Sequence, residues 1–374
     1  MYLDNAATTR VCALSAQAAT AAMTSEYGNP SSTHKKGRQA ASLVKRGRAQ
    51  IAKALNCSPD EIYFTASGTE SDNWAIFGSA AVSARVGKHI ISSKAEHPAV
   101  LKSLSELDRR GFEVTLVSPE PDGSVSAKSV LDALRPDTVL VSLMLVSNET
   151  GGVTDIAGIK KTLLENKSKA LLHTDAVQAF LKVPTDVKAL GCDLLSISGH
   201  KVHAPKGIGA LFVRRGLRIA PYIFGGGQEN GMRGGTESVP LIAAFGEAVH
   251  DSLENCPDSP AMLRELKDYL TTRLSVLIPE AHILKSDAPH IISISLPGYR
   301  SEVLMNFLEA RDIFVSRSSA CKKGGRSHVL EAIGLPSSVI DGTLRLGLSR
   351  YTTKNELDIF CDMLGEAKNT LVHR

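Results

Sequence analysis

The chain has 374 residues, of which 43% are apolar and 22% charged, and these globular proportions exclude wholesale disorder. Its net charge of +4 is too small to indicate direct nucleic-acid binding, and its apolar runs are too short to span a membrane. Six scattered cysteines exclude a disulfide framework and fit a reducing compartment. The first residues show no secretory signal, so we expect a cytoplasmic protein of about two domains.

Short apolar runs alternate with helix-like segments between about residues 60 and 215. Strands are predicted at residues 61–64, 88–92, 112–117, 138–146, 170–174, 193–198 and 208–213. Several of these runs are continuously apolar, as strands covered on both faces are, and alternation with helices is typical of parallel sheets. The sequence therefore predicts an α/β fold with a mostly parallel seven-stranded sheet flanked by helices.

The pattern changes after about residue 250. Ser259 is predicted to cap a helix with Pro260 in its first position. A strand near residues 291–295, a helix from Ser301, a strand at 313–316 and a closing helix follow. That last helix opens with Thr353 and Glu356 in capping-box spacing. We expect a large domain at residues 15–252 and a smaller α+β domain at residues 1–14 together with 253–374.

One stretch between Glu26 and Asp60 is basic and contains no acidic residue. Its cations are Lys35, Lys36, Arg38, Lys45, Arg46, Arg48 and Lys53. Such a run is most often a solvated helix face. A docking surface for an acidic partner or RNA is the alternative, and the sequence leaves both open.

Two polar residues follow predicted strands, where open α/β sheets bind ligands. Lys201 follows the strand at 193–198, and a lysine whose pKa is lowered can form a Schiff base with an aldehyde. Asp175 ends the run at 170–174, and a carboxylate facing a pyridinium nitrogen is what a pyridoxal phosphate site requires. Taken alone, such a lysine is usually a surface residue and such an aspartate is usually a helix cap.

Two further strand exits carry candidate ligand-binding groups. Residues 65–71 are small and polar and run into a helix start, where backbone N–H groups can hold phosphate. His97 follows another strand, although a lone histidine is usually structural. His200 and His203 also form a loose pair, but no third ligand accompanies them, so no metal site is predicted.

In this order, these elements closely resemble the cysteine desulfurases, which are fold type I pyridoxal phosphate enzymes of the class V aminotransferase group. The resemblance runs nearly end to end. Its further motifs lie at residues 3–9, 28–32, 148–151, 225–229, 235–237 and 318–321. It implies a pyridoxal phosphate cofactor and a homodimer.

The resemblance also implies a role for each matching residue. Lys201 would form the Schiff base with the cofactor, Asp175 would pair with the ring nitrogen, Gln178 would contact the ring hydroxyl, and His97 would stack on the ring. Asn148 and Arg345 would orient the substrate, with the planar guanidinium clamping its carboxylate. The residues expected to hold the phosphate are Gly68, Thr69, Ser198, His200 and, reaching in from the other subunit, Thr236.

Cys321 is predicted to be the catalytic cysteine. Cys12, Cys192 and Cys361 lie in apolar contexts, where a thiol is usually inert. Cys321 lies in a small, basic segment whose four cations favour the thiolate. The segment is shorter than is usual in similar proteins, which leaves its reach open.

The expected reaction removes sulfur from L-cysteine and gives L-alanine and a persulfide on Cys321. Lys201 would remove the α-proton, and His97 is a candidate proton donor. The persulfide would pass to a sulfur-acceptor protein or a tRNA-thiolation enzyme, for iron–sulfur cluster assembly or thiolation. An aminotransferase or a selenocysteine lyase is the alternative, followed by a non-catalytic sulfur-trafficking partner.

Overall fold

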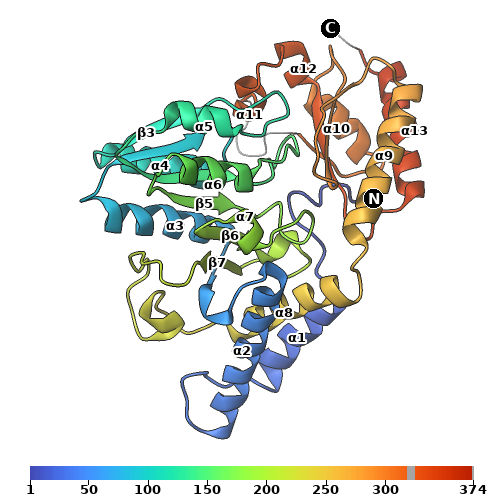
Figure 1. The fold of residues 1–374 in the computed structure, drawn as a ribbon. Coiled ribbons are helices and arrows are strands. Elements are labelled where there is room, and N and C mark those ends of the chain that lie inside the picture. The colour runs from blue at the N-terminus through green and yellow to red at the C-terminus, as the bar shows by residue number, and fades with distance from the viewer. Residues whose placement is uncertain (318–324, 373–374) are drawn as a thin grey trace.

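Seven strands form the larger sheet of the computed structural model, which describes residues 1–317 and 325–372 (Figure 1). They are β1 (Ile62–Thr65), β2 (His89–Ser93), β3 (Glu113–Val117), β4 (Thr138–Met144), β5 (Leu171–Asp175), β6 (Leu194–Ser198) and β7 (Gly209–Val213). Their order is β1-β7-β6-β5-β4-β2-β3, and β7 runs antiparallel to both neighbours while the other pairs are parallel. The predicted α/β fold is confirmed, and each predicted strand overlaps an observed one.

Both faces of this sheet are covered. Ile90 of β2 packs in the cluster that includes α3 and α4, while its neighbour Ile91 packs in the cluster that includes α2, α6 and α8. Successive strand residues point to opposite faces, so Ile90 and Ile91 are both buried, and the central strand β4 is buried along its whole length. The helices around the sheet are α1 (Ala13–Thr24), α2 (Lys35–Leu55), α3 (Gly68–Ser83), α4 (Pro98–Arg109), α5 (Ala127–Ala133), α6 (Ile156–Glu165), α7 (Val187–Leu190) and α8 (Val239–Glu254), with short 3₁₀ turns η1 (Pro59–Glu61), η2 (Gly199–Lys201) and η3 (Gln228–Gly231).

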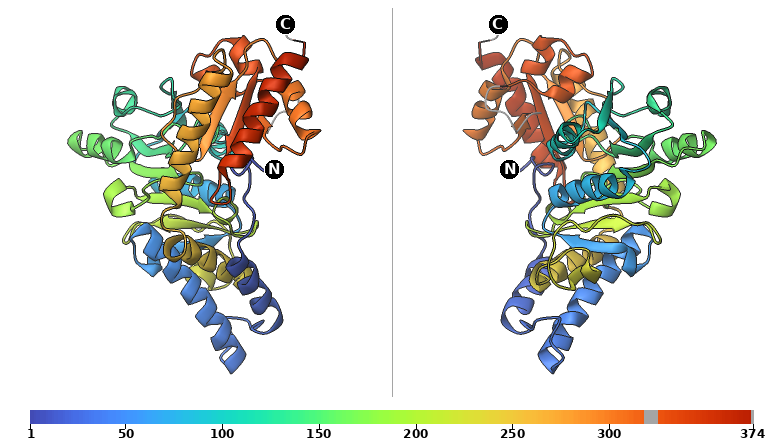
Figure 2. Two further views of the ribbon diagram at one scale, coloured as in Figure 1. Left: turned by 90° about the vertical axis from the view of Figure 1, so that its right-hand side faces the viewer. Right: turned by 90° about the vertical axis from the view of Figure 1, so that its left-hand side faces the viewer.

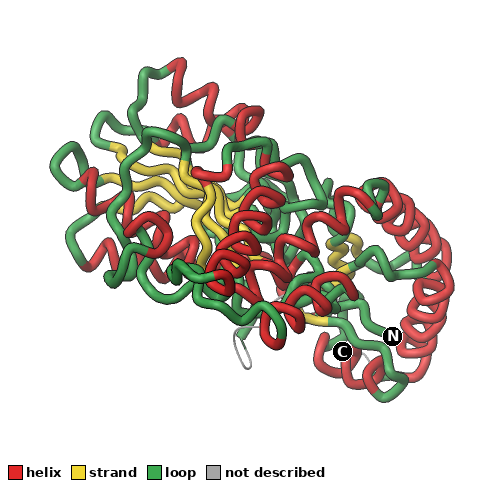
Figure 3. Tube along the Cα trace, turned by 90° about the horizontal axis from the view of Figure 1, so that it is seen from below, coloured by secondary structure: helices red, strands yellow, loops and turns green. Residues whose placement is uncertain are grey.

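A smaller antiparallel sheet lies apart from the first, on the side of the molecule where both termini are marked (Figure 3). Its order is β10 (Ser316–Arg317), β11 (Thr343–Gly347), β9 (Ile291–Ser295) and β8 (His282–Ile283). Leucines of α9 (Ser259–Leu277) and α13 (Lys354–Thr370) pack with β9 and β11 in one apolar cluster. The other helices here are α10 (Ser301–Glu309), α11 (His328–Ala332) and α12 (Ser337–Asp341).

Two local predictions for this part of the chain are wrong. Asp258, and not Ser259, occupies the capping position of α9, because Ser259 already has helical backbone angles. The strand expected at residues 313–316 is displaced: β10 covers Ser316–Arg317, and Phe314 pairs instead with Tyr2 in an isolated bridge. The predicted Thr353–Glu356 capping box is confirmed.

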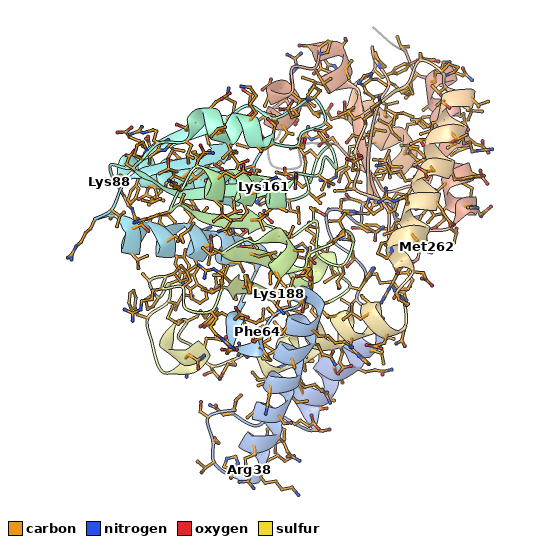
Figure 4. The ribbon with its side chains drawn as sticks, in the orientation of Figure 1. Arg38, Phe64, Lys88, Lys161, Lys188 and Met262 are labelled. Carbon is orange, nitrogen blue, oxygen red and sulfur yellow. The ribbon has the colours of Figure 1, made fainter. Side chains whose placement is uncertain are left out.

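The basic stretch forms α2, which extends from the lower end of the molecule in both side views (Figure 2). Arg38 lies near its far end, away from both sheets (Figure 4). Arg46 and Lys53 pair with Glu247 and Glu254 of α8. These two cations of the basic stretch therefore help to hold α2 against α8. Among the described residues, none of the helices is long and apolar enough to cross a membrane.

The crossing of α2 and α8 depends on two facing glycines. A Cβ atom added to Gly246 would lie 2.5 Å from the Cα atom of Gly47. We expect Gly246→Ala to lower the melting temperature by about 2–5 °C, because the backbones must separate, which outweighs the gain in helix propensity. Scanning calorimetry measures this shift. Gly365→Ala in α13 is the control, since its Cβ would meet only Leu277 at 3.6 Å; equal shifts in both variants would contradict the argument.

Candidate active site

Ten of the predicted site residues line one cavity of about 340 Å³ beyond the carboxyl ends of the parallel strands. They are Gly68, Thr69, His97, Asn148, Asp175, Gln178, Ser198, His200, Lys201 and Arg345. The first nine come from the larger sheet and its loops, and Arg345 comes from β11 of the smaller sheet. The cavity therefore lies where the two sheets meet.

Lys201 ends the short turn η2 that follows β6. Its Nζ donates to the backbone carbonyls of Ala6 and Ala7, at 2.7 Å each. Burial and, second, the nearby Arg345 guanidinium lower the pKa of Lys201 to about 8, against the opposing effect of Asp175. A larger share of this amine is therefore unprotonated near neutral pH, which is the form that attacks an aldehyde.

Asp175 ends β5 at the floor of the cavity and is 4% exposed. One of its oxygens, Oδ1, accepts from the N–H of Val177 over 2.9 Å. Burial raises the pKa of Asp175, while the charges of His97 and Lys201 lower it. Asp72 and Glu96 are also buried close by, and burial raises the pKa of both well above the usual range, with Asp175 adding to the effect. A cation at this position, such as a protonated ring nitrogen, would stabilise the ionised form of Asp175.

The start of α3 forms the opposite end of the cavity. Ser67 caps the helix by accepting from the N–H of Glu70, and the first N–H groups of a helix have no partner within it. A Cβ atom at Gly68 would lie 2.6 Å from Val177 and 3.4 Å from the side chain of Ser198, so only glycine fits against this wall. The positive helix end and the Ser198 hydroxyl suit an anionic phosphate.

Two histidines face the cavity in the neutral form. His97 caps α4, and its Nδ1 accepts from the N–H of Ala99 over 3.1 Å, which leaves the proton on Nε2. Burial lowers the pKa of His97, and burial followed by the charge of Lys201 lowers the pKa of His200 to about 4. Neutral rings at these places suit ring stacking and hydrogen bonding better than charge pairing.

The guanidinium of Arg345 has hydrogen-bond partners for only some of its N–H groups. Its side chain is 4% exposed, Nη1 donates to the carbonyl of Asn148 over 2.8 Å, and Nη2 donates to Asp4 over 3.2 Å. Nε is buried and has no hydrogen-bond partner in the described residues. A substrate carboxylate at the cavity wall could take up this remaining capacity, because a guanidinium binds carboxylates at two points. Gln178 donates to the carbonyl of Ala6 over 2.9 Å.

Thr236 does not line this cavity, and Cys321 lies outside the described residues. Thr236 is exposed in a loop that two ion pairs join to helices α2 and α3: Glu229 accepts from Arg48 of α2 over 2.7 Å, and Arg233 donates to Glu70 of α3 over 2.9 Å. Cys12, Cys192 and Cys361 are buried, as their apolar contexts predict. In the described ranges, no group of three or more His, Cys, Asp or Glu side chains could hold a metal ion.

Three residues at the site, Glu149, Ser327 and His328, were not predicted from the sequence. Glu149 is 4% exposed and accepts from the hydroxyl of Ser327, a residue 178 positions away. His328 lines the cavity, and its Nε2 donates to the carbonyl of Glu96 over 3.1 Å. Glu149 does lie in the quoted motif at residues 148–151, but no local pattern in the sequence indicates these long-range contacts.

Comparisons with known proteins fit this geometry. Residues 1–360 match the family described as Aminotransferase class-V. The cysteine desulfurase IscS of Methanosarcina thermophila is 40% identical over 371 residues, which are 98% of this chain and 91% of the relative. A solved structure named NifS-like protein has a TM-score of 0.93 at 34% identity and covers 99% of this chain and 100% of its own. SspA in complex with cysteine has a TM-score of 0.82 at 34% identity, covering 94% and 99%.

The fold and the cavity are those of a class-V aminotransferase. Within that class, the chain belongs to the cysteine desulfurases. The resemblance seen in the sequence motifs is therefore confirmed over nearly the whole chain.

Glu149 gives the site a pH-dependent stability. Burial raises the pKa of Glu149 from its ordinary value of 4.5 to about 7. The folded state therefore holds a proton that the unfolded state has lost, and the stability this provides disappears as pH rises from about 5 through 7. Between pH 5 and pH 8 the free energy of unfolding of the wild type should therefore fall relative to that of Glu149→Gln. We expect this relative change to reach about 3 kcal/mol in favour of Glu149→Gln.

Melting temperatures of both proteins across this range measure the effect. Glu106→Gln is the control, because Arg110 lowers the pKa of the exposed Glu106 and its own titration falls below this window. Parallel pH profiles for the wild type and Glu149→Gln would contradict the argument.

Proposed function

We propose that this protein is a pyridoxal phosphate-dependent cysteine desulfurase that removes sulfur from L-cysteine, giving L-alanine and a persulfide on Cys321. The observation that carries the proposal is the convergence of Lys201, Asp175 and Arg345 on one cavity, which brings an amine, a carboxylate and a guanidinium together from two sheets. The named relatives supply the substrate class.

The residues of the cavity fit pyridoxal phosphate. The start of α3 with Gly68, Thr69, Ser198 and His200 would hold the phosphate, and Thr236 would serve the second subunit of a homodimer. The buried Asp175 would face the ring nitrogen, Gln178 the ring hydroxyl and His97 the ring face, with Lys201 at the aldehyde. Bound there, the cofactor supplies an electron-accepting ring that makes the α-proton of the substrate acidic and its Cβ–S bond breakable.

The chain's own groups position the substrate and move its protons. Arg345 and Asn148 would hold the carboxylate of L-cysteine, so that its α-carbon faces the Lys201 amine. Lys201 would then remove the α-proton, a role that its lowered pKa favours. The neutral His97, with its proton on Nε2, would be the proton donor.

Cys321 would act on the substrate sulfur. Its thiolate attacks that sulfur, a new S–S bond forms, the Cβ–S bond breaks, and the carbon fragment is protonated to alanine. Both described flanks of residues 318–324 lie at the cavity: Ser316 pairs with Arg345 between β10 and β11, and Ser327 bonds to Glu149. These contacts of the described neighbours with two residues of the cavity support the assignment.

The remaining features are proposals of the same kind. We place the sulfur acceptor among proteins of iron–sulfur cluster assembly or tRNA thiolation, and the enzyme in the cytoplasm. The division into a large domain at residues 15–252 and a small one from the remaining residues also stays a prediction.

Loss of the Cys321 thiol tests the reaction itself. We expect equimolar alanine and sulfide from L-cysteine and a thiol reductant with the wild type, and a loss of about a hundredfold or more in Cys321→Ala, because the sulfur then has no acceptor. The absorbance of the bound cofactor should not change. Cys57→Ala, which removes a half-buried thiol away from the cavity, should keep full turnover. Turnover that survives in Cys321→Ala would instead favour a lyase or an aminotransferase.

Arg345 tests how the substrate is held. We expect Arg345→Lys to raise the KM for L-cysteine by about 10- to 100-fold with a smaller effect on kcat, because an ammonium cannot replace the two-point contact of a guanidinium. Steady-state kinetics measure both constants. Arg326→Lys is the matched control, since Arg326 also lines the cavity but is already bound to Asp341 at 2.7 and 2.9 Å. Equal effects in both variants would remove Arg345 from this role.

A further inference from the structure

A second cavity of about 400 Å³ lies on the other side of Lys201. Lys201 lines both this cavity and the candidate active site. The walls of the second cavity come from the segment after β5, the turn η2, the start of α9 and residues 348–350, so that it also bridges the two sheets. The reaction described above uses none of its other polar groups.

Lys182 is the buried amine of this cavity. It is 9% exposed, and its Nζ donates to the backbone carbonyl of Lys201 over 2.8 Å. Among the described residues no Asp or Glu lines the cavity, and no ion pair involves Lys182. A buried ammonium group without a counter-ion is unfavourable, and a bound anion would relieve it.

A second cation lies in the same wall. The side chain of Arg350 is 6% exposed; its Nη2 pairs with Asp251, while Nε and Nη1 have no hydrogen-bond partner in the part of the chain that the structure describes. About half of the lining residues are apolar, with Leu181, Val183 and Leu263 among them. The cavity thus combines positive charge with an apolar surface.

The backbone around the cavity is strained. Leu181 and His203 both line it, and both have positive φ angles, of 60° and 67°. A non-glycine residue in this region costs about 1 to 3 kcal/mol, and such residues gather at ligand sites. Two of them around one cavity are a separate reason, besides the charge, to regard it as a built site.

We propose that this second cavity binds a small organic carboxylate that has a short apolar tail and no ammonium group. The carboxylate would supply the missing counter-charge to Lys182, and the tail would pack against the aliphatic wall. A ligand ammonium would find no carboxylate partner there and would lie close to Lys182, so amino acids are excluded. The Lys182 amine donates to the backbone carbonyl of Lys201. The bound ligand would therefore lie next to Lys201 on the side away from the candidate active site.

The proposal has a defined pH dependence. Burial and the charge of Lys201 lower the pKa of Lys182 to about 7. The histidines near it are His200, His203 and His290, whose pKa values are lowered mainly by burial, so these rings are neutral. The other ionisable groups that line the cavity are Lys201, Arg350 and Cys256. A bound carboxylate favours the protonated amine, so binding takes up a proton and weakens as pH rises above the pKa of Lys182.

Isothermal titration calorimetry of the purified, cofactor-loaded protein with butyrate tests the site. We expect saturable binding with proton uptake in buffers of different ionisation enthalpy. Lys182→Met should weaken binding at least about tenfold, whereas Lys182→Arg should keep it and abolish its pH dependence, because arginine stays charged. Lys188→Met, which removes an exposed lysine of α7 (Figure 4), is the matched control and should bind like the wild type.

Three outcomes would overturn the proposal. The first is no saturable binding to the wild type, and the second is equal binding to Lys182→Met. The third is a failure of ligand selectivity, seen as equal binding of 4-aminobutyrate or tighter binding of inorganic phosphate. Arg345→Lys separates the two cavities, since butyrate at the candidate active site would depend on Arg345 and butyrate in the second cavity would not. This result does not depend on whether the protein desulfurates L-cysteine.

Discussion

The N-terminal segment, residues 3–12, fixes the two sheets relative to each other, and the site depends on it. The N–H of Asn5 donates to the carbonyl of Gly347 in β11 over 3.1 Å, and the N–H of Thr9 donates to that of His200 over 2.9 Å. Between these two bonds, the carbonyls of residues 6 and 7 accept from the Lys201 amine. A Cβ atom at Gly347 would lie 2.2 Å from the backbone nitrogen of residue 6, so glycine is needed where the segment crosses β11. One short segment, which turns at residues 5–7, therefore contacts both the Lys201 amine and the strand that carries Arg345.

Within this frame, the titratable groups of the site are held in environments that disfavour their charges. Burial raises the pKa values of Asp72 and Glu96 and lowers those of His97 and Lys201. Such an arrangement costs stability unless a ligand compensates for it. A cationic ring at Asp175 would stabilise the ionised form of that buried carboxyl, which supports the proposed pyridoxal phosphate.

The sequence predicts the parts of the fold and site that depend on local pattern. Short apolar runs alternating with helix-like segments predict all seven strands of the larger sheet, and the rule that ligands bind beyond strand ends places Lys201 and Asp175 together. Arg345 was placed by family resemblance alone, because nothing local shows that β11 meets the larger sheet. Glu149 and Ser327 were missed for the same reason: their contact joins residues 178 positions apart. The cap of α9 was misplaced by one residue because Asp258 and Ser259 are both good capping residues.

Lys201 therefore has a different environment on each of its two sides. Its amine faces the candidate active site, and its backbone carbonyl accepts from Lys182, which belongs to the second cavity. The charge of Lys201 contributes to the lowered pKa of Lys182, so neutralising one amine makes the other easier to protonate. A change in the charge or position of the Lys201 amine would reach Lys182, because the Lys182 amine donates to the backbone carbonyl of Lys201. Any ligand of the second cavity would act in the opposite direction along the same path, because coupling between two sites is reciprocal.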